Sequence, residues 1–218
     1  MKRSGLWVFG LPAAGVVVAA ICVVHFWPAP LSLTTATATN PATQPQWAKP
    51  LSAPGLTNFF QVSPTLYRGA QPDEEGMRQL KAMGVRSVIN LRELPWHDDR
   101  TIVGDTGLKC YRIRLMAWDN PEGEDVNQFL RLVSDPENLP AFVHCQYGSD
   151  RTGAMCAIYR IAIDGWTPRQ AQQEMLEGGF GFHGMWENLA DYIAKRNPQL
   201  LRRKAEEYAK KEPVPSSP

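Results

Sequence analysis

Residues 143–153, VHCQYGSDRTG, combine side chains that together can do chemistry on a bound anion. An apolar run ends at His144 and Cys145, and Arg151 follows the cysteine after five residues. Loop amides and a helix N-terminus can converge on an anion, and an Arg can hold two phosphate oxygens at once. The same positive field stabilises a thiolate, which would make Cys145 a nucleophile at neutral pH. The pattern therefore favours attack of a thiolate on the phosphorus of a bound phosphomonoester.

The spacing of Cys145 and Arg151 is weak evidence by itself, because such a pair arises often by chance. A buried, inert cysteine at the end of a strand is the alternative explanation. Two neighbouring features favour a reactive Cys145 over an inert one. Gly148 permits the backbone turn that an anion-binding loop needs, and a helical pattern opens at Thr152. A strand, a loop and a helix start thus follow one another in this stretch, which is the context that the chemistry requires.

The pattern HCxxGxxRT resembles the signature of the cysteine-dependent protein tyrosine phosphatases, and most of all that of their small dual-specificity branch. Residues 66–93 are similar to the entry segment of atypical dual-specificity phosphatases like those of plants and fungi. Residues 179–193 are similar to the closing helices of bacterial members. The resemblance extends over residues 56–197, so it covers the expected domain and leaves the N-terminal region out.

The resemblance implies roles for the residues of the loop. Cys145 is expected to be the nucleophile and to form a phosphocysteine intermediate. Thr152 is expected to stabilise the thiolate and help its departure, while His144 supports the thiolate and orients the loop. The resemblance also implies that the reaction needs no metal and no cofactor. The expected phosphate-binding positions are Gln146, Tyr147, Gly148, Ser149, Asp150 and Arg151.

The leaving oxygen needs a proton, so a carboxyl group must come from a nearby loop. The candidates lie in MAWDNPEGED, after the predicted strand at residues 108–116. Asp119 directly follows that strand and is similar to the acid of the family, so it is the first choice. Asp125 stands at the start of the next helix, where an acidic residue is already favoured electrostatically. We therefore expect Asp119 to be the general acid and keep Asp125 as the alternative.

The loop also bears on the substrate. It contains no Lys, and Asp150 adds a negative charge beside Arg151, which disfavours a highly phosphorylated ligand on Coulomb grounds. Tyr147 offers an apolar wall to an aromatic leaving group. We expect a phosphotyrosine protein as the substrate, with phosphoserine and phosphothreonine proteins as further candidates, or a small phosphomonoester. Two alternatives stay open: an inositol-phosphate phosphatase with the same chemistry, and a phosphate-binding module without turnover.

Further side chains belong to the same predicted edge. Arg92 and Arg68 end strands there and are candidates to meet substrate, although an ion pair explains them equally well. Trp118 and Phe180 are candidates for the walls of a cleft, although aromatic residues near a sheet edge more often belong to the core.

Apolar periodicity predicts the elements that position these residues. Strands are expected at residues 58–62, 66–68, 85–91, 108–116 and 141–144. Helices are expected at residues 73–83, 124–133, 152–164, 168–177 and 184–194, with another after Pro198. Strands that alternate with helices predict an α/β fold. We expect a central, mostly parallel sheet of about four to five strands flanked by helices, as in dual-specificity phosphatases.

Composition excludes several classes of protein. With 218 residues, 44% hydrophobic and 21% charged, the chain is long enough for one globular domain with extensions. The net charge of +1 implies no basic face for nucleic acid. Three of the four cysteines lie outside the N-terminal apolar run, and an odd number is not a disulfide framework. No CxxC occurs and no His has metal-ligand spacing, so no structural zinc site is expected.

The N-terminal 30 residues predict a membrane helix. Lys2 and Arg3 precede an apolar run from Leu6 to Trp27, long enough to cross a hydrocarbon core of ~30 Å. A cleaved signal peptide is the alternative, because small residues follow at 36–38. Either reading exports the rest of the chain and makes it membrane-anchored or secreted. The predicted domains are an anchor or signal at 1–30, a flexible linker at 31–55, a phosphatase domain at 56–200, and the end of a C-terminal helix with a disordered tail at 201–218.

Overall fold

The computed structural model describes residues 46–94, 104–116 and 118–210. Within these ranges the strands form one six-stranded sheet in the order β1-β2-β3-β6-β4-β5. The four strands β3, β6, β4 and β5 pair in parallel, and β2 and β1 extend this sheet antiparallel at one edge. The expected α/β class is confirmed, with six strands instead of four to five. The strands are β1 Lys49–Pro50, β2 Phe60–Ser63, β3 Leu66–Gly69, β4 Ser87–Arg92, β5 Lys109–Leu115 and β6 Ala141–His144.

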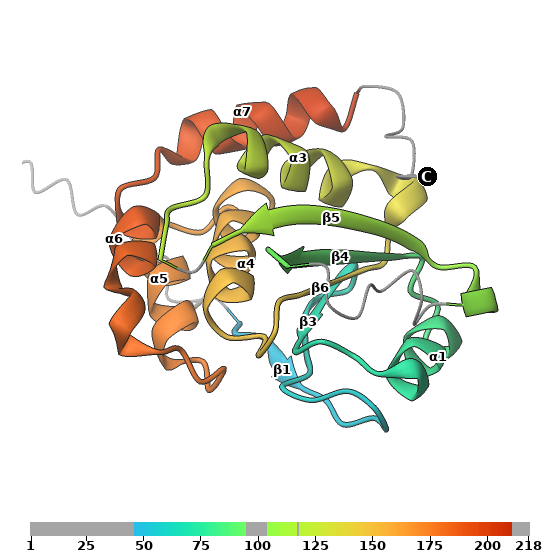
Figure 1. Ribbon diagram of the computed structural model, residues 1–218. Coiled ribbons are helices and arrows are strands. Elements are labelled where there is room, and N and C mark those ends of the chain that lie inside the picture. Colours follow the sequence, from blue (N-terminus) through green and yellow to red (C-terminus); the bar gives the residue numbers. More distant parts are fainter. Residues whose placement is uncertain (1–45, 95–103, 117, 211–218) are drawn as a thin grey trace, which may run out of the picture. The chain divides into compact units, whose positions relative to one another are not determined.

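Helices flank this sheet on both faces. Figure 1 shows α1 apart from the other helices, at the lower right, while α4, α5 and α6 gather at the left with α3 and α7 above. Short 3₁₀ turns lie at Gly104–Thr106, Pro136–Asn138 and Gly184–Trp186. The α-helices are α1 Glu74–Ala82, α3 Gly123–Ser134, α4 Asp150–Ala162, α5 Pro168–Glu177, α6 Glu187–Ala194 and α7 Pro198–Tyr208.

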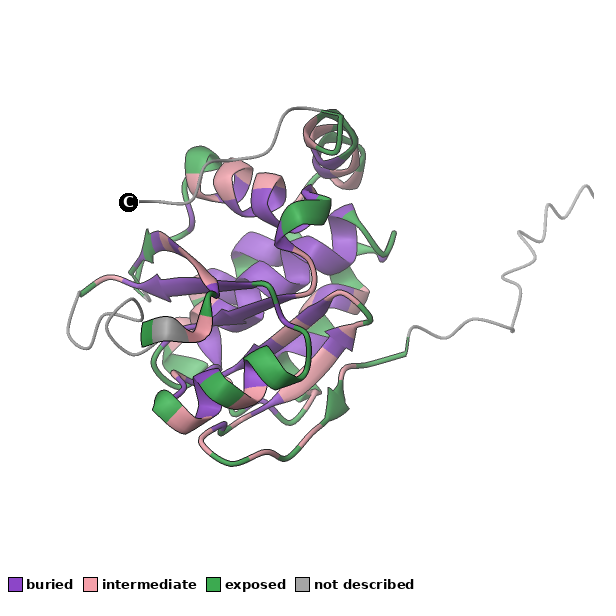
Figure 2. Cartoon of the chain, turned by 90° about the vertical axis from the view of Figure 1, so that its right-hand side faces the viewer, coloured by how far each residue is buried: buried purple, intermediate pink, exposed green. Residues whose placement is uncertain are grey.

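The alternation of side chains along the central strands builds two apolar clusters. Val88 and Phe142 face the smaller cluster, in which α1 buries Met77 and Leu80. Their neighbours in sequence, such as Ile89, face the larger cluster on the opposite side of the sheet. Successive residues of a strand point to opposite faces, so both clusters follow from the same continuous apolar runs. Figure 2 shows the buried residues concentrated in the middle of the fold.

Helix α4 lies between the sheet and the outer helices, which is why nearly all of it is buried. Twelve of its thirteen residues, all but Arg151, are buried. A helix that is buried on every side lies in the core and holds its position by packing. The helix that follows the anion-binding loop is therefore fixed by the core of the domain. This helix in turn fixes the C-terminal end of the loop.

A buried ion pair joins α4 to α5. Arg160 Nη2 lies 2.6 Å from Glu174 Oε1, and both side chains are 4% exposed. The same carboxylate oxygen accepts a hydrogen bond of 2.7 Å from the backbone N–H of Ala48, next to β1. Asp164, two residues beyond the end of α4, gives Arg160 a second acidic partner at 2.8 Å. The pair thus fixes two helices and the first described residues of the chain.

Replacing Glu174 by Gln should lower the free energy of unfolding by about 3 kcal/mol, because Arg160 then loses its buried acidic partner and keeps only Asp164, which is partly exposed. Urea unfolding followed by far-UV circular dichroism measures the change. The control is Asp191→Asn, which breaks an ion pair with Lys195 whose side chains are mostly exposed. That variant should unfold at the wild-type midpoint. Equal midpoints for wild type and Glu174→Gln would contradict the prediction.

The predicted membrane anchor, residues 1–30, lies outside the described residues. In the ranges that the structure covers, none of the helices is long and apolar enough to cross a bilayer. This finding corrects the expected localisation, which placed a membrane-anchored or secreted protein on the exported side. We therefore assign the chain to no compartment, and the membrane is withdrawn as an expected partner.

Candidate active site

Cys145 directly follows β6, and α4 begins five residues later at Asp150. We name residues 145–151 the anion loop. Ser149 occupies the N-cap position of α4 but makes no side-chain cap bond; its hydroxyl donates instead to the carbonyl of Phe180 at 2.8 Å. The first-turn amides of α4 are therefore not satisfied by a capping side chain, and a helix N-terminus of this kind binds anions. The predicted order of strand, loop and helix start is confirmed.

Gly148 is the one position in the loop where a side chain cannot fit. Its φ is +74°, and a Cβ atom built there would lie 2.4 Å from the backbone carbon of Gly69. The loop therefore rests directly on the end of β3. Any other residue at this position would combine an unfavourable backbone conformation with a steric clash against backbone atoms.

Arg68 stabilises the anion loop through hydrogen bonds to two of its backbone carbonyls. Its Nη2 donates to the carbonyl of Gly148 at 2.6 Å and to that of Ser149 at 3.3 Å, and the residue is 1% exposed. The guanidinium carbon lies 3.7 Å from the ring centre of Phe180, a cation–π contact. Burial lowers the pKa of Arg68, while Cys156, Glu174 and Cys145 oppose that shift electrostatically. Arg68 was a candidate to contact the substrate, but in the structure it is buried and hydrogen-bonded to the anion loop, so it holds the loop in place.

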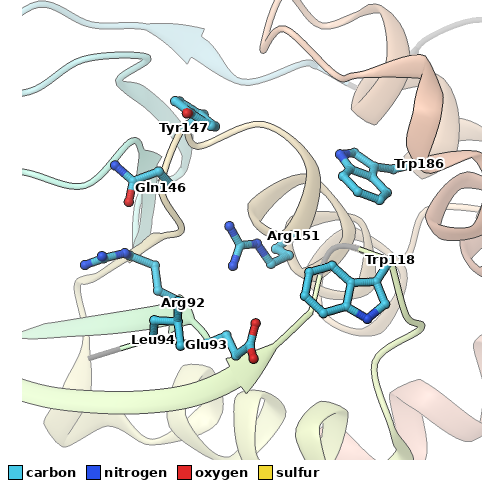
Figure 3. Close-up of a pocket in the computed structure, with 8 residues that line it drawn as sticks. All are labelled: Arg92, Glu93, Leu94, Trp118, Gln146, Tyr147, Arg151 and Trp186. Atoms are coloured by element: carbon cyan, nitrogen blue, oxygen red, sulfur yellow. The ribbon is translucent and has the colours of Figure 1, made fainter. Parts of the chain in front are cut away.

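Arg151 lies at the centre of a pocket of about 490 Å³. Its Nη1 donates to the carbonyl of Leu115, at the end of β5, at 3.3 Å. Figure 3 shows Trp118 and Trp186 on one side of the guanidinium and Gln146 and Tyr147 on the other. The walls thus combine two guanidinium groups, that of half-buried Arg151 and that of buried Arg92, with three aromatic rings. The lining residues are Arg92, Glu93, Leu94, Trp118, Gln146, Tyr147, Arg151 and Trp186.

The two side chains that flank the loop are fully buried. His144 Nδ1 lies 3.0 Å from the carbonyl oxygen of Cys145, and its ring stacks on Phe142 at 5.7 Å between ring centres. The hydroxyl of Thr152 is buried and has no hydrogen-bond partner in the described part of the chain. A buried hydroxyl without a partner is costly, so one that stands beside a reactive loop is a candidate donor to a reacting group.

The cysteines of the domain differ in their surroundings. Cys145 and Cys156 are both free and only 2% exposed. Burial raises the pKa of the Cys156 thiol to about 11, so it stays protonated at neutral pH. Cys145 instead begins the anion loop, between the end of β6 and the N-terminus of α4. Of this pair, Cys145 is therefore the candidate nucleophile, and Cys156 belongs to the core.

The two candidate acids have different positions. Asp125 accepts a hydrogen bond of 2.8 Å from the backbone N–H of Glu122 and belongs to the capping box of α3. Asp119 is exposed, and its carboxylate accepts a local hydrogen bond of 2.8 Å from the backbone N–H of Asn120. Asp119 lines a neighbouring cavity of about 280 Å³, while Trp118 beside it lines the Arg151 pocket. Glu93 is the carboxylate that lines the Arg151 pocket itself.

The sequence predicts a free negative charge of Asp150 beside Arg151, but the Asp150 carboxylate is paired in the structure. The residue is 6% exposed, and both carboxylate oxygens contact His183. Phe180, a candidate wall of the cleft, is 2% exposed and lies under the loop, whereas Trp118 is 63% exposed and lines the pocket. Of the two aromatic residues proposed as cleft walls, Trp118 therefore lines the pocket and Phe180 does not.

Sequence reasoning missed three residues that shape the site. Asn58 has a φ of +49°, and its amide donates to the carbonyls of Tyr147 at 2.8 Å and Phe180 at 2.9 Å. His183 bonds to the loop, and Trp186 lines the pocket. The glycine-rich GFGFHGMW stretch was the available signal for the last two, since its glycines at 179 and 181 have positive φ. In the ranges that the structure describes, no group of three or more His, Cys, Asp or Glu is placed to hold a metal.

Comparisons with known proteins agree on one family. Residues 57–185 match the model described as "PTP-NADK: DSP-PTPase phosphatase fused to NAD+ Kinase". The dual specificity protein phosphatase TpbA of Pseudomonas aeruginosa is 31% identical over 159 residues, which are 72% of this chain and 70% of TpbA. Its crystal structure matches with a TM-score of 0.65 at 28% identity, over 75% of this chain and 98% of that one. An inositol diphosphatase of Arabidopsis thaliana is 27% identical over 47% of this chain and 53% of its own length.

Proposed function

The chain belongs to the atypical dual-specificity phosphatases of the cysteine-dependent protein tyrosine phosphatase superfamily, and from this premise we propose that it hydrolyses phosphotyrosine in proteins. The observation that carries the substrate class is the Arg151 pocket, where the Arg151 guanidinium lies among Trp118, Tyr147 and Trp186 and Arg92 is a second cationic lining residue. Aromatic side chains favour an aromatic leaving group by stacking and burial. A crystal structure of a cysteine-to-serine variant of TpbA is described as a complex with phosphotyrosine, which supports the same class for this chain.

The proposed reaction has two steps. The Cys145 thiolate attacks phosphorus, so an S–P bond forms while the bond from phosphorus to the tyrosyl oxygen breaks, and Asp119 gives that oxygen its proton. Water then attacks the phosphocysteine, the S–P bond breaks, and Asp119 accepts the proton of the water. Arg151 and the loop amides hold the three phosphoryl oxygens in both steps. The buried Thr152 hydroxyl is the proposed donor to the departing thiolate.

Inositol-phosphate hydrolysis is the second candidate, because inositol diphosphatases are among the relatives of this chain. The same nucleophile and the same Arg151 would serve it. The two substrates differ in charge and shape, since an inositol polyphosphate carries several anionic groups and no aromatic ring. Phosphate release from phosphotyrosine peptides, phosphoserine peptides and inositol polyphosphates at equal concentration separates the candidates. A higher kcat/KM for the inositol ligand than for the phosphotyrosine peptide would contradict our proposal.

Replacing Asp119 by Asn should lower kcat about 10²-fold for a phosphotyrosine peptide, because the leaving oxygen then departs without a proton. The loss should be smaller for p-nitrophenyl phosphate, whose leaving group is a weaker base. Steady-state rates on the two substrates measure both effects.

Glu93→Gln is the matched control for that experiment, because Glu93 is the carboxylate that lines the Arg151 pocket. This variant should keep the dependence on the leaving group that wild type shows. If Glu93→Gln loses more activity than Asp119→Asn, and loses it most on the poorer leaving group, Glu93 is the acid instead. Asp125→Asn should mainly lower stability, because Asp125 caps α3.

A further inference from the structure

The segment that connects α5 to α6, residues 178–186, lies directly against the anion loop. It carries His183 and Trp186, and Trp186 is one of the aromatic walls of the Arg151 pocket. Figure 3 shows Trp186 across the pocket from Tyr147, with Arg151 between them. The position of this segment therefore determines the width and the apolar character of the pocket mouth.

Asp150 and His183 connect this segment to the loop through three contacts. The backbone N–H of His183 donates to Asp150 Oδ1 at 2.8 Å. The ring Nδ1 of His183 lies 2.9 Å from Oδ2 and 3.1 Å from Oδ1. The aspartate side chain is 8% exposed and the histidine side chain 49% exposed. Both oxygens of a nearly buried carboxylate are thus engaged by one residue of the connecting segment.

The rest of the segment is held at its other end, near Phe180. The Ser149 hydroxyl and the Asn58 amide both donate to the Phe180 carbonyl, at 2.8 and 2.9 Å. The Phe180 ring packs under Arg68 and meets Phe60 edge to face, at 4.8 Å between ring centres. These contacts fix the segment near Phe180, so the contacts of Asp150 hold the part that leads toward Trp186. The His183 ring also lies 6.1 Å from the ring of Tyr147, the opposite wall.

We propose that Asp150 and His183 are a positioning pair that sets substrate specificity: they hold the α5–α6 connection on the anion loop and thereby keep Trp186 at the pocket mouth. The inference deepens the proposed function and rests on it. The pair selects aromatic phosphomonoesters because a fixed Trp186 can stack on the leaving group, whereas a small aliphatic ester gains nothing from it. The negative charge of Asp150 acts through His183 and not by repelling the substrate.

The test compares His183→Ala and Asp150→Ala with wild type on phosphotyrosine and on phosphoserine. The His183 side chain is half-exposed, so its removal leaves the core intact. For both variants, kcat/KM for phosphotyrosine should fall about tenfold, mostly through KM, as expected when binding common to ground and transition states is lost. For His183→Ala the value for phosphoserine should change less than about twofold, because that substrate makes no contact that depends on Trp186. Asp150 belongs to the anion loop, so for Asp150→Ala the readout is the ratio of the two values, which should fall as it does for His183→Ala. Asp150→Asn keeps an acceptor for the His183 N–H and should recover part of the loss.

A double-mutant cycle asks whether the pair acts through Trp186. Trp186→Ala alone should lower the preference for phosphotyrosine over phosphoserine. In that background His183→Ala should lower it no further. Asp164→Asn is the matched control, because it removes an aspartate paired with a cation at the opposite end of α4. It should leave the preference at the wild-type value even if the melting temperature falls.

The results can also overturn the proposal. It is wrong if His183→Ala and Asp150→Ala keep the wild-type preference, or if their effects add fully to that of Trp186→Ala. A repelling role of Asp150 would instead raise kcat/KM of Asp150→Asn for inositol polyphosphates, with an unchanged preference for aromatic esters. A wild-type protein that hydrolyses no phosphomonoester would contradict the proposed function, which is a different outcome from an active enzyme whose preference ignores the pair.

Discussion

Replacing Cys145 by Ser should abolish turnover of phosphomonoesters, with a fall in kcat of at least about 10⁴-fold, because a serine hydroxyl is not ionised at neutral pH and is a far weaker nucleophile. The substitution changes one atom in a residue that is 2% exposed, so the loop should keep its shape. The contacts of Arg68 and Asn58 to the loop use backbone carbonyls and are independent of the sulfur. Binding of phosphotyrosine should therefore survive the loss of chemistry.

The measurement is hydrolysis of p-nitrophenyl phosphate without added metal, together with calorimetric binding of a phosphotyrosine peptide. Cys156→Ala is the matched control, since it removes a buried thiol whose raised pKa keeps it protonated. This variant should retain activity within a few-fold, apart from the cost of a small cavity. Iodoacetamide should label Cys145 in wild type and leave Cys156 unmodified. Turnover by Cys145→Ser at the wild-type rate would contradict the mechanism.

The parts of the site that depend on neighbours in sequence could be predicted. Strand β6 has the predicted bounds, and α4 begins within the predicted loop-to-helix transition. Both follow from an apolar run that ends at a loop with a glycine, and these signals act over a few residues. The match of Cys145 and Arg151 to a family pattern relies on the same short range. Local features of this kind are set by backbone conformation and burial, which the sequence records directly.

The parts that depend on distant residues could not be predicted. Arg68 donates to Gly148 across 80 positions of sequence, and Asn58 to Phe180 across 122. No periodicity or spacing connects such residues, because the sheet order brings β3 beside β6 only after folding. Asp150 shows the consequence most clearly. The sequence predicts that its charge acts on the substrate, but its partner, His183, lies 33 positions away in the chain.

Replacing Arg151 by Lys should lower kcat/KM for phosphotyrosine roughly 10³-fold, since an arginine that stabilises a phosphoryl transition state contributes 10³ or more. A lysine keeps the positive charge but offers a single ammonium group, whereas the guanidinium can donate to two phosphoryl oxygens at once. Arg151 is already directed by the hydrogen bond of Nη1 to the Leu115 carbonyl, at 3.3 Å. A flexible lysine side chain would not be held in that orientation. Steady-state kinetics of the variant on a phosphotyrosine peptide measures the loss.

Arg92→Lys is the matched control, because Arg92 lines the same pocket at the end of β4. This variant should lower kcat/KM for phosphotyrosine less than about tenfold, as expected for a guanidinium that does not donate to two oxygens of the transferred phosphoryl group. Inhibition by inorganic phosphate then separates binding from catalysis. If Arg151 acts mainly on the transition state, Arg151→Lys should weaken phosphate binding far less than it lowers kcat, because interactions that strengthen in the transition state appear in kcat. Equal losses for Arg151→Lys and Arg92→Lys would show that charge alone matters, and the bidentate role of Arg151 would then be wrong.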